Sequence, residues 1–563
     1  MTFHSRRRFV QGLITAAGLV ALPRVGITTE IDSTAAVLRG SSFDLEIAEI
    51  PVNFTGARRM ATAVNGQIPG PQLRWREGDE ITIRVTNRLS STTSIHWHGL
   101  IVPADMDGVP GISFHGIAPG ATFTYRFRVN QSGTYWYHAH SRFQEQLGLY
   151  GSIVVEPRTP SRHQADREHV LLLSDWTDRN PEALYRLLKI HPGYFNFGKR
   201  TAADFVRDVR SQGWNTTTAD RAMWNQMRMD PTDLADVSGY AYTYLLNGAT
   251  PAANWSALFK RGERVRLRII NGASMTFFDL RIPGLPLTVV ASDGQDVEPV
   301  TVDEFRIGPA EVLDVMVMPQ EERPYTIFAQ AMDRSGYARG TLTPRLGLQA
   351  DVPAVDSRTI LTAADMGMAH GAAMDHSAHA GHAMTTPPQH APAEFGPMVD
   401  MLVDAPINRL DDPGVGLRDN GRRVLTYADL HTLDGPIDDR DPGREIELHL
   451  TGHMDRFVWS FSGQRFSEAT PLRFRHGERL RIVLINDTMM THPIHLHGMW
   501  SEVESPHGAV QLRKHTVTVQ PAQRLSYRVT ADALGRWAYH CHLLYHMEAG
   551  MFREVVVEHG EPS

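Results

Sequence analysis

The chain has 563 residues, of which 42% are hydrophobic, and its 56 Lys and Arg against 63 Asp and Glu give a formal charge of −7. That length and apolar content suit three or four globular domains. The sequence has no basic stripe with interleaved aromatics, which excludes a nucleic-acid partner, and its one sustained apolar stretch, residues 12–22, is about half of what crosses a bilayer.

The N-terminal segment predicts export. Arg6, Arg7 and Arg8 precede the short apolar stretch, which is the pattern of a twin-arginine signal. An ordinary secretory signal with a basic end is the alternative, and both place the protein outside the cytoplasm. We expect residues 1–35 to be signal peptide and leader, the protein to lie in the periplasm, and no part of it to span a membrane.

Short runs rich in β-branched residues, bounded by Gly, Pro or Asn, predict an all-β protein. One run occurs three times, at residues 78–87, 262–271 and 477–486, each beginning with Gly and ending with Asn nine residues later. Three copies at equal internal spacing predict three homologous domains. We place the domains and the connecting linker at residues 40–160, 165–350, 351–398 (linker) and 399–563.

The first and third domains each carry two His-x-His pairs. Residues i and i+2 of a β-strand point to the same face, so each pair presents two imidazoles to one metal centre. A structural histidine that only hydrogen-bonds its surroundings is the alternative for a single pair, but four pairs at equivalent places favour metal binding. The middle domain has none and is predicted to be a spacer. The pairs are His96 and His98, His138 and His140, His495 and His497, and His540 and His542.

Methionines mark two other segments. Met223, Met227 and Met229 lie in a stretch predicted to be helical, where core packing is the favoured interpretation. Residues 366–384 of the linker combine Met and His, whose thioethers and imidazoles suit Cu(I) and Cu(II) respectively. This segment is a candidate site for extra copper, and an inert low-complexity tether is the alternative.

The single cysteine, Cys541, lies between His540 and His542, so no intramolecular disulfide is possible. In an extended strand it faces away from both neighbours, and one strand then touches two metal sites. With His492 and His546 it offers the thiolate and two imidazoles of a blue-copper site, and Met551 offers the weak axial ligand. The alternative is an inert buried cysteine.

Four ordered motifs carry a resemblance to a known family: His-Trp-His-Gly at 96–99, Trp-Tyr-His-Ala-His at 136–140, His-Pro-Ile-His-Leu-His-Gly at 492–498, and the segment around Cys541. The sequence resembles the multicopper oxidases, and among them the bacterial copper-resistance oxidases of the CopA type. The resemblance implies three cupredoxin-like Greek-key β-sandwich domains and four copper ions. These are one type 1 ion and a cluster of one type 2 ion and a type 3 pair between the first and last domains.

The resemblance also implies a role for each ligand. The type 1 ligands are His492, Cys541, His546 and Met551, the type 2 ligands are His96 and His495, and the type 3 ligands are His98, His138, His140, His497, His540 and His542. Cys541 would be the electron exit, and Asp107 resembles the carboxylate that supplies protons near the type 2 ion. For Asp107 the alternative is a turn aspartate. Several relatives carry a second carboxylate directly after the distal type 1 histidine, where this sequence has Met547 followed by Glu548.

The function expected from these features is the one-electron oxidation of Cu(I), and of small phenols, coupled to the four-electron reduction of O₂ to water, in copper resistance. A copper-sequestering periplasmic protein with incidental laccase activity is the alternative. A two-domain nitrite reductase is disfavoured because it lacks the eight-histidine set. Expected partners are O₂, the reductant and other periplasmic copper-handling proteins.

Overall fold

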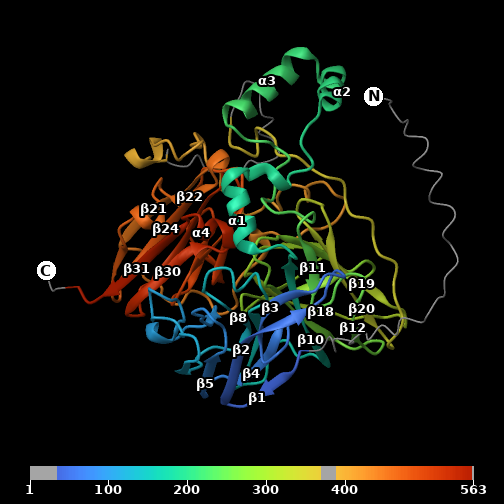
Figure 1. Cartoon of the computed structure of the whole chain (residues 1–563), viewed down its shortest axis with the longest axis vertical. Coiled ribbons are helices and arrows are strands. Elements are labelled where there is room, and N and C mark those ends of the chain that lie inside the picture. Colours follow the sequence, from blue (N-terminus) through green and yellow to red (C-terminus); the bar gives the residue numbers. More distant parts are fainter. Residues whose placement is uncertain (1–34, 369–387, 561–563) are drawn as a thin grey trace, which may run out of the picture. The chain divides into compact units, whose positions relative to one another are not determined.

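A computed structural model describes residues 35–368 and 388–560. Residues 1–34 of the predicted leader and residues 369–384 of the Met/His-rich segment lie outside the described residues. The described chain confirms the predicted fold class, because it is mostly β and its strands form six sheets, two in each of three sandwiches. Figure 1 shows the three groups of strands in blue, green to yellow, and orange to red.

The first sandwich pairs a five-stranded sheet, in the order β1-β4-β9-β8-β6, with a four-stranded sheet, in the order β3-β2-β5-β7. In β5, Ile81, Ile83 and Val85 alternate with polar residues and are fully buried, so one face of the strand forms core. The strands are β1 Val37–Arg39, β2 Ser42–Val52, β3 Arg59–Val64, β4 Gly70–Arg76, β5 Glu80–Asn87, β6 His96–His98, β7 Thr122–Arg128, β8 Gly133–His138 and β9 Tyr150–Glu156.

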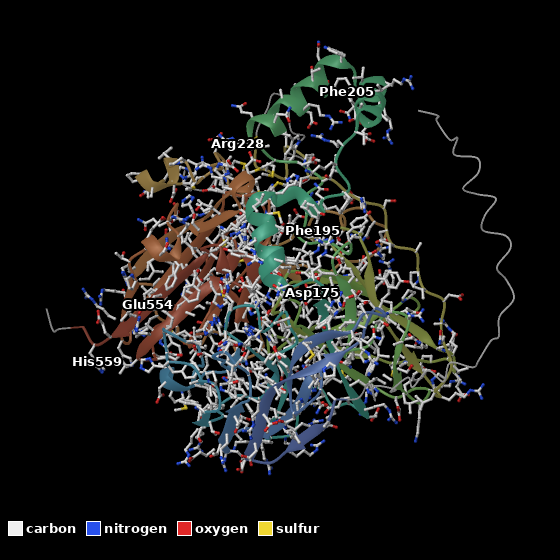
Figure 2. The ribbon with its side chains drawn as sticks, viewed as in Figure 1. Asp175, Phe195, Phe205, Arg228, Glu554 and His559 are labelled. Carbon is white, nitrogen blue, oxygen red and sulfur yellow. The ribbon has the colours of Figure 1, made fainter. Side chains whose placement is uncertain are left out.

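The middle sandwich combines a six-stranded sheet, β11-β10-β13-β18-β15-β16, with a five-stranded sheet, β12-β20-β19-β14-β17. Asp175, labelled in Figure 2, lies near the end of β10 and is buried. It accepts hydrogen bonds from the backbone N–H groups of Ser274 and Met275. The strands are β10 Arg167–Trp176, β11 Thr243–Leu246, β12 Trp255–Leu258, β13 Val265–Asn271, β14 Phe278–Arg281, β15 Leu287–Ser292, β16 Gln295–Val302, β17 Glu304–Ile307, β18 Val312–Val317, β19 Tyr325–Ala331 and β20 Tyr337–Thr343.

Helices α1 (Pro181–Ile190), α2 (Ala202–Gln212) and α3 (Trp214–Gln226) lie between β10 and β11 in the chain. The Asn180 side chain caps α1, and Pro181 takes a first-turn position where no N–H is needed. Met223 is on α3, and Met227 and Met229, just after it, are buried in the core, as the packing interpretation predicts. In α1, Lys189 donates from Nζ to the Phe457 carbonyl at 2.6 Å, which ties the helix to the third sandwich.

The third sandwich combines sheets β22-β21-β24-β29-β26-β27 and β23-β31-β30-β25-β28, with the short helix α4 (Leu544–Glu548) between β30 and β31. Among the described residues, no helix is long and apolar enough to cross a membrane. The strands are β21 Arg444–His453, β22 Val458–Phe461, β23 Leu472–Arg475, β24 Arg479–Asn486, β25 His492–Leu496, β26 Ser501–Glu504, β27 Val510–Lys514, β28 Thr516–Val519, β29 Arg524–Thr530, β30 Gly535–Cys541 and β31 Phe552–Glu558.

The three sequence repeats occupy one equivalent position, because β5, β13 and β24 each pair in parallel with one neighbour and antiparallel with the other. Their terminal residues, Asn87, Asn271 and Asn486, are fully buried. Each Nδ2 donates to two backbone carbonyls at 2.7–3.1 Å, and each Oδ1 accepts from the N–H two residues later. The repeat asparagine therefore fixes the loop that follows its strand.

The linker assigned to residues 351–398 is partly packed. Leu361 is 3% exposed and Met366 is fully buried, and the Leu361 N–H donates to the Pro231 carbonyl at 2.9 Å. Arg409 also holds the carbonyls of Ala364 and Asp365. Its Pro and Ala content gives this stretch no regular structure up to residue 361, but its few apolar side chains join the core.

Candidate metal centres

Strand pairing brings the histidine pairs together within each sandwich. In the first sandwich β6 pairs with β8 so that His96 lies opposite His138. In the third, β25 pairs with β30 so that His495 lies opposite His540 and Ile494 lies opposite Cys541. Neighbouring strands therefore present their imidazoles on one shared face.

The eight paired histidines gather in one place, four from the first sandwich and four from the third. Ring nitrogens lie within 4.8 Å of one another in three groups: His96, His98 and His495; His98, His138 and His542; and His140, His497 and His540. His540 Nε2 lies 3.0 Å from His497 Nε2 and 3.2 Å from His140 Nε2. In the second group, the Nε2 atoms of His138 and His542 are 3.4 Å apart.

A further group lies inside the third sandwich. Cys541 Sγ is 3.6 Å from His492 Nδ1 and 4.0 Å from His546 Nδ1, and these two nitrogens are 3.2 Å apart. Met551 is fully buried. Its carbonyl accepts from the Cys541 N–H and its own N–H donates to the His546 carbonyl, so it lies beside this group. The Trp459 ring stacks on His546 at 3.8 Å between centroids.

Asp107 lies between two of these histidines. Its carboxylate Oδ2 is 2.9 Å from His497 Nδ1, and its backbone carbonyl is 2.8 Å from His96 Nδ1. The side chain is fully buried. Because each Nδ1 donates its hydrogen to Asp107, each Nε2 keeps a lone pair directed into the histidine group.

Other partners hold the outer ring nitrogens in the same way. His138 Nδ1 lies 2.6 Å from Glu145 Oε2, and His546 Nε2 lies 2.6 Å from Asp236 Oδ2. His495 Nδ1 lies 2.5 Å from the His515 carbonyl. Carboxylate and carbonyl partners of this kind orient metal-binding imidazoles and fix their tautomers.

Burial controls the protonation of these groups. It lowers the pKa of His98, His138 and His497 well below the usual histidine value, with further lowering from neighbouring imidazoles, and lowers the pKa of His540 to about 4. These rings are therefore neutral at pH 7, as metal ligands must be. Burial also raises the pKa of the Cys541 thiol, so a bound metal is needed to form the thiolate.

Three family models, all described as multicopper oxidase, match residues 46–160, 439–561 and 167–345. The chain is 55% identical to a copper resistance protein A homolog of Pseudomonas syringae pv. tomato, over 98% of this chain and 99% of that protein. Copper resistance protein A of Escherichia coli matches with the same identity and coverage. The chain belongs to the multicopper oxidase family. Among solved structures, the laccase from Botrytis aclada matches with a TM-score of 0.64 and 21% identity, covering 93% of this chain and 88% of the laccase.

The groups fit the copper ions of a multicopper oxidase. Both His497 and His540 donate from Nδ1 to oxygen, so their two Nε2 lone pairs face each other at 3.0 Å. No hydrogen bond can join two lone pairs, but two nitrogens bound to one ion at about 2.0–2.1 Å lie roughly 3.3 Å apart at a tetrahedral angle. His96 Nε2 and His495 Nε2 are buried and have no hydrogen-bond partner among the described residues. Such nitrogens are rare unless an ion or water occupies the site.

Sequence reasoning did not single out Asp236, Glu145 or His515. Asp236 lies 310 residues before His546 in the chain, and no local signal links the two. Glu145 follows His140 by five residues, and a buried acid so close to a ligand pair was the available signal. His515 is buried and its Nδ1 lies 3.2 Å from His98 Nε2.

Glu548, two residues after His546, follows the position at which several relatives are expected to carry a second carboxylate. Its side chain pairs with Arg142, and its backbone carbonyl accepts from the Tyr185 hydroxyl at 2.9 Å. Glu145 is buried and contacts His138.

Proposed function

We propose that this protein is a periplasmic oxidase that couples the one-electron oxidation of Cu(I), and of small phenols, to the reduction of O₂ to water, and so protects the cell from copper. Full-length similarity to proteins named copper resistance protein A supports this. When bound, the copper ions supply the redox chemistry: one accepts single electrons, and three together reduce O₂.

The observation that carries the proposal is the placement of strand β30. Its end directs Cys541 toward His492 and His546, while the neighbouring His540 contacts His140 and His497. The backbone between His540 and Cys541 therefore connects the group around Cys541 with the histidine groups. We assign His492, Cys541, His546 and Met551 to type 1 copper and His96 and His495 to type 2 copper, and we assign His98, His138, His140, His497, His540 and His542 to the type 3 pair.

Electron entry is proposed to pass Asp236. His546 is fully buried, and Asp236, which is 2% exposed, holds its outer nitrogen. The carboxylate that holds this ligand attracts a cationic donor more strongly than a neutral phenol. This arrangement favours Cu(I) as the reductant.

Proton supply is assigned to Asp107, because reduction of O₂ to water consumes four protons and this carboxylate contacts ligands of two different groups. Glu145 holds His138 in its tautomer and is a positioning residue.

Oxygen uptake on adding Cu(I) or a phenol to the copper-loaded protein tests the function. Sustained uptake in proportion to the donor is expected. The alternative, a copper-sequestering protein with incidental laccase activity, would bind Cu(I) without sustained uptake. For export, changing Arg6 and Arg7 together to Lys should leave the protein in the cytoplasmic fraction, and periplasmic recovery of that variant would exclude the twin-arginine route.

A further inference from the structure

Buried carboxylates in this protein follow two patterns of pairing. Several pair with arginine: Asp279 with Arg306 and Arg334, Asp314 with Arg266 and Arg268, Glu304 with Arg281 and Arg422, and Glu502 with Arg479. The carboxylates around the copper ligands pair with histidine instead: Asp107, Glu145 and Asp236. Two further buried carboxylates contact histidine, Asp400 with His453 and Asp293 with His515, but they also pair with Arg228 and Lys514 respectively. Apart from the cluster described next, buried carboxylates of the described chain that pair with histidine and with no Lys or Arg contact copper ligands.

The same pattern occurs at another place in the third sandwich. His390, Glu394, His449 and Asp487 bring one ligand atom each to within 4.8 Å of one another. His390 Nδ1 lies 2.8 Å from Glu394 Oε2, and His449 Nδ1 lies 2.7 Å from Asp487 Oδ2 and 3.8 Å from Glu394 Oε2. We call these four residues the 390 cluster.

Rigid elements position the 390 cluster. His449 lies on β21, and Asp487 directly follows β24, which pairs with β21 in parallel. Glu394 lies in the short 3-10 helix Pro392–Phe395, and His390 lies just before it. Asp487 also accepts the Val403 N–H at its other oxygen, at 2.9 Å, which fixes its rotamer.

The charges in the 390 cluster are not balanced as they are elsewhere. Glu394 and Asp487 are 2% and 1% exposed, and within the described ranges neither has a Lys or Arg partner. Both ring nitrogens of His449 face carboxylates, since Nε2 lies 3.3 Å from Glu447 Oε1. Because the only charged partners of these two buried carboxylates are imidazoles, a cation can replace a ring hydrogen between them.

Glu447 is not one of the four residues of the 390 cluster, but it contacts His449. It accepts from His449 Nε2, from the Gln389 N–H at 2.9 Å and from Arg524 Nη1 at 2.7 Å. A carboxylate that takes the outer hydrogen of a ligand imidazole leaves the inner nitrogen free for a metal. It also ties the chain next to His390 to β21.

We propose that the 390 cluster is a separate Cu(II)-binding site. The donors are two imidazoles and two carboxylates without sulfur, a set that suits Cu(II) and disfavours Cu(I). At about 2.0 Å from an ion, donors at right angles lie roughly 2.9 Å apart and donors at a tetrahedral angle roughly 3.3 Å apart. The separations of 2.7 and 2.8 Å are those of charge-assisted hydrogen bonds, and they are short enough for both atoms of each pair to reach one ion. Among divalent first-row ions, nitrogen and oxygen donors hold Cu(II) most tightly.

The site is reachable from solvent through His390, whose side chain is 17% exposed while the other three are almost completely buried. In the sequence, His390 follows Met384, the end of the Met/His-rich segment, by six residues. The 390 cluster shares no residue with the four oxidase copper sites, so Cu(II) binding there does not depend on turnover.

The test uses the full-length protein with its oxidase sites loaded, in the oxidised state and without reductant. Cu(II) is added during equilibrium dialysis, and copper per chain is measured for the unaltered protein, His390→Ala and Glu394→Gln. The control is His476→Ala, which removes an exposed histidine outside the cluster. Because the Met/His-rich segment is present in every sample, copper bound there cancels in the comparison.

The unaltered protein and the control should hold about one Cu(II) per chain more than the two cluster variants, and each variant should bind that ion at least tenfold more weakly. The extra ion should show nitrogen couplings from two imidazoles in its paramagnetic resonance spectrum. Unchanged blue absorbance shows which variants fold. If Glu394→Gln does not fold, His390→Ala still tests the proposal, because His390 is partly exposed. Equal copper in all samples would mean that the cluster is only an ion-pair network and would overturn the proposal. Retention of Zn²⁺ but not Cu(II) would overturn the copper assignment, and neither result bears on oxidase activity.

Discussion

Replacing Asp107 with Asn should slow the reaction with O₂ without removing copper. The carboxylate accepts from His497 Nδ1 at 2.9 Å, and an amide oxygen in the same place can accept that hydrogen bond. The backbone carbonyl that holds His96 is unaffected. The ligand geometry should therefore remain, while the group that exchanges protons is lost.

The size of the effect follows from the role. General acid–base catalysis contributes about 10²–10⁴-fold, so at its lower limit the loss is roughly 100-fold, or about 2.7 kcal/mol in the barrier. Within the described residues, the histidines that Asp107 contacts are His96 and His497, which are not type 1 ligands. The blue absorbance of the type 1 site should therefore be unchanged.

The assay is stopped-flow re-oxidation of the fully reduced protein by O₂ across a range of pH, with copper per chain measured on the same sample. Asp105→Asn is the matched control, because it makes the same change on an exposed residue of the same turn. Re-oxidation of Asp107→Asn at the unaltered rate at every pH would refute the proton-donor role and leave Asp107 as an orienting residue.

Four further changes have defined outcomes. Cys541→Ser should give a folded protein without blue absorbance or donor oxidation, and retention of the colour would refute the type 1 assignment. Asp236→Asn should slow Cu(I) oxidation more than phenol oxidation, measured by oxygen uptake; equal losses would argue against carboxylate guidance. Asn271→Ala strands three buried backbone groups and should lower the free energy of unfolding by about 3 kcal/mol, seen as a lower Tm, and an unchanged Tm would contradict the bonding described. Deleting residues 369–384, a range that spares the buried Met366, should weaken Cu(I) oxidation or copper tolerance and leave phenol oxidation intact; no loss for either donor would indicate an inert tether.

Local periodicity was sufficient to predict much of the site. Alternation along a strand predicts that Cys541 and its histidine neighbours face opposite sides, and the structure places them so. Equal spacing of the glycine and asparagine in each repeat predicts equivalent strands, and β5, β13 and β24 are equivalent.

Contacts between distant segments could not be predicted in this way. Asp236 meets His546 only because the chain between β10 and β11 folds against the third sandwich. The 390 cluster likewise joins residues almost 100 positions apart, which no spacing rule relates. Composition predicts a linker without regular structure at residues 351–368, but it does not predict which of its side chains, such as Leu361, pack into the core.

The middle sandwich serves as an internal reference for the other two. It keeps Asn271 with the same three hydrogen bonds as Asn87 and Asn486, although it carries no histidine pair. The bonding of these asparagines therefore belongs to the inherited scaffold and not to copper chemistry. In the third sandwich the same bonds fix the Met490 carbonyl two residues before His492. Hydrogen bonds to peptide groups thus fix the loop before His492 in the absence of metal. Copper binding therefore does not require this loop to fold.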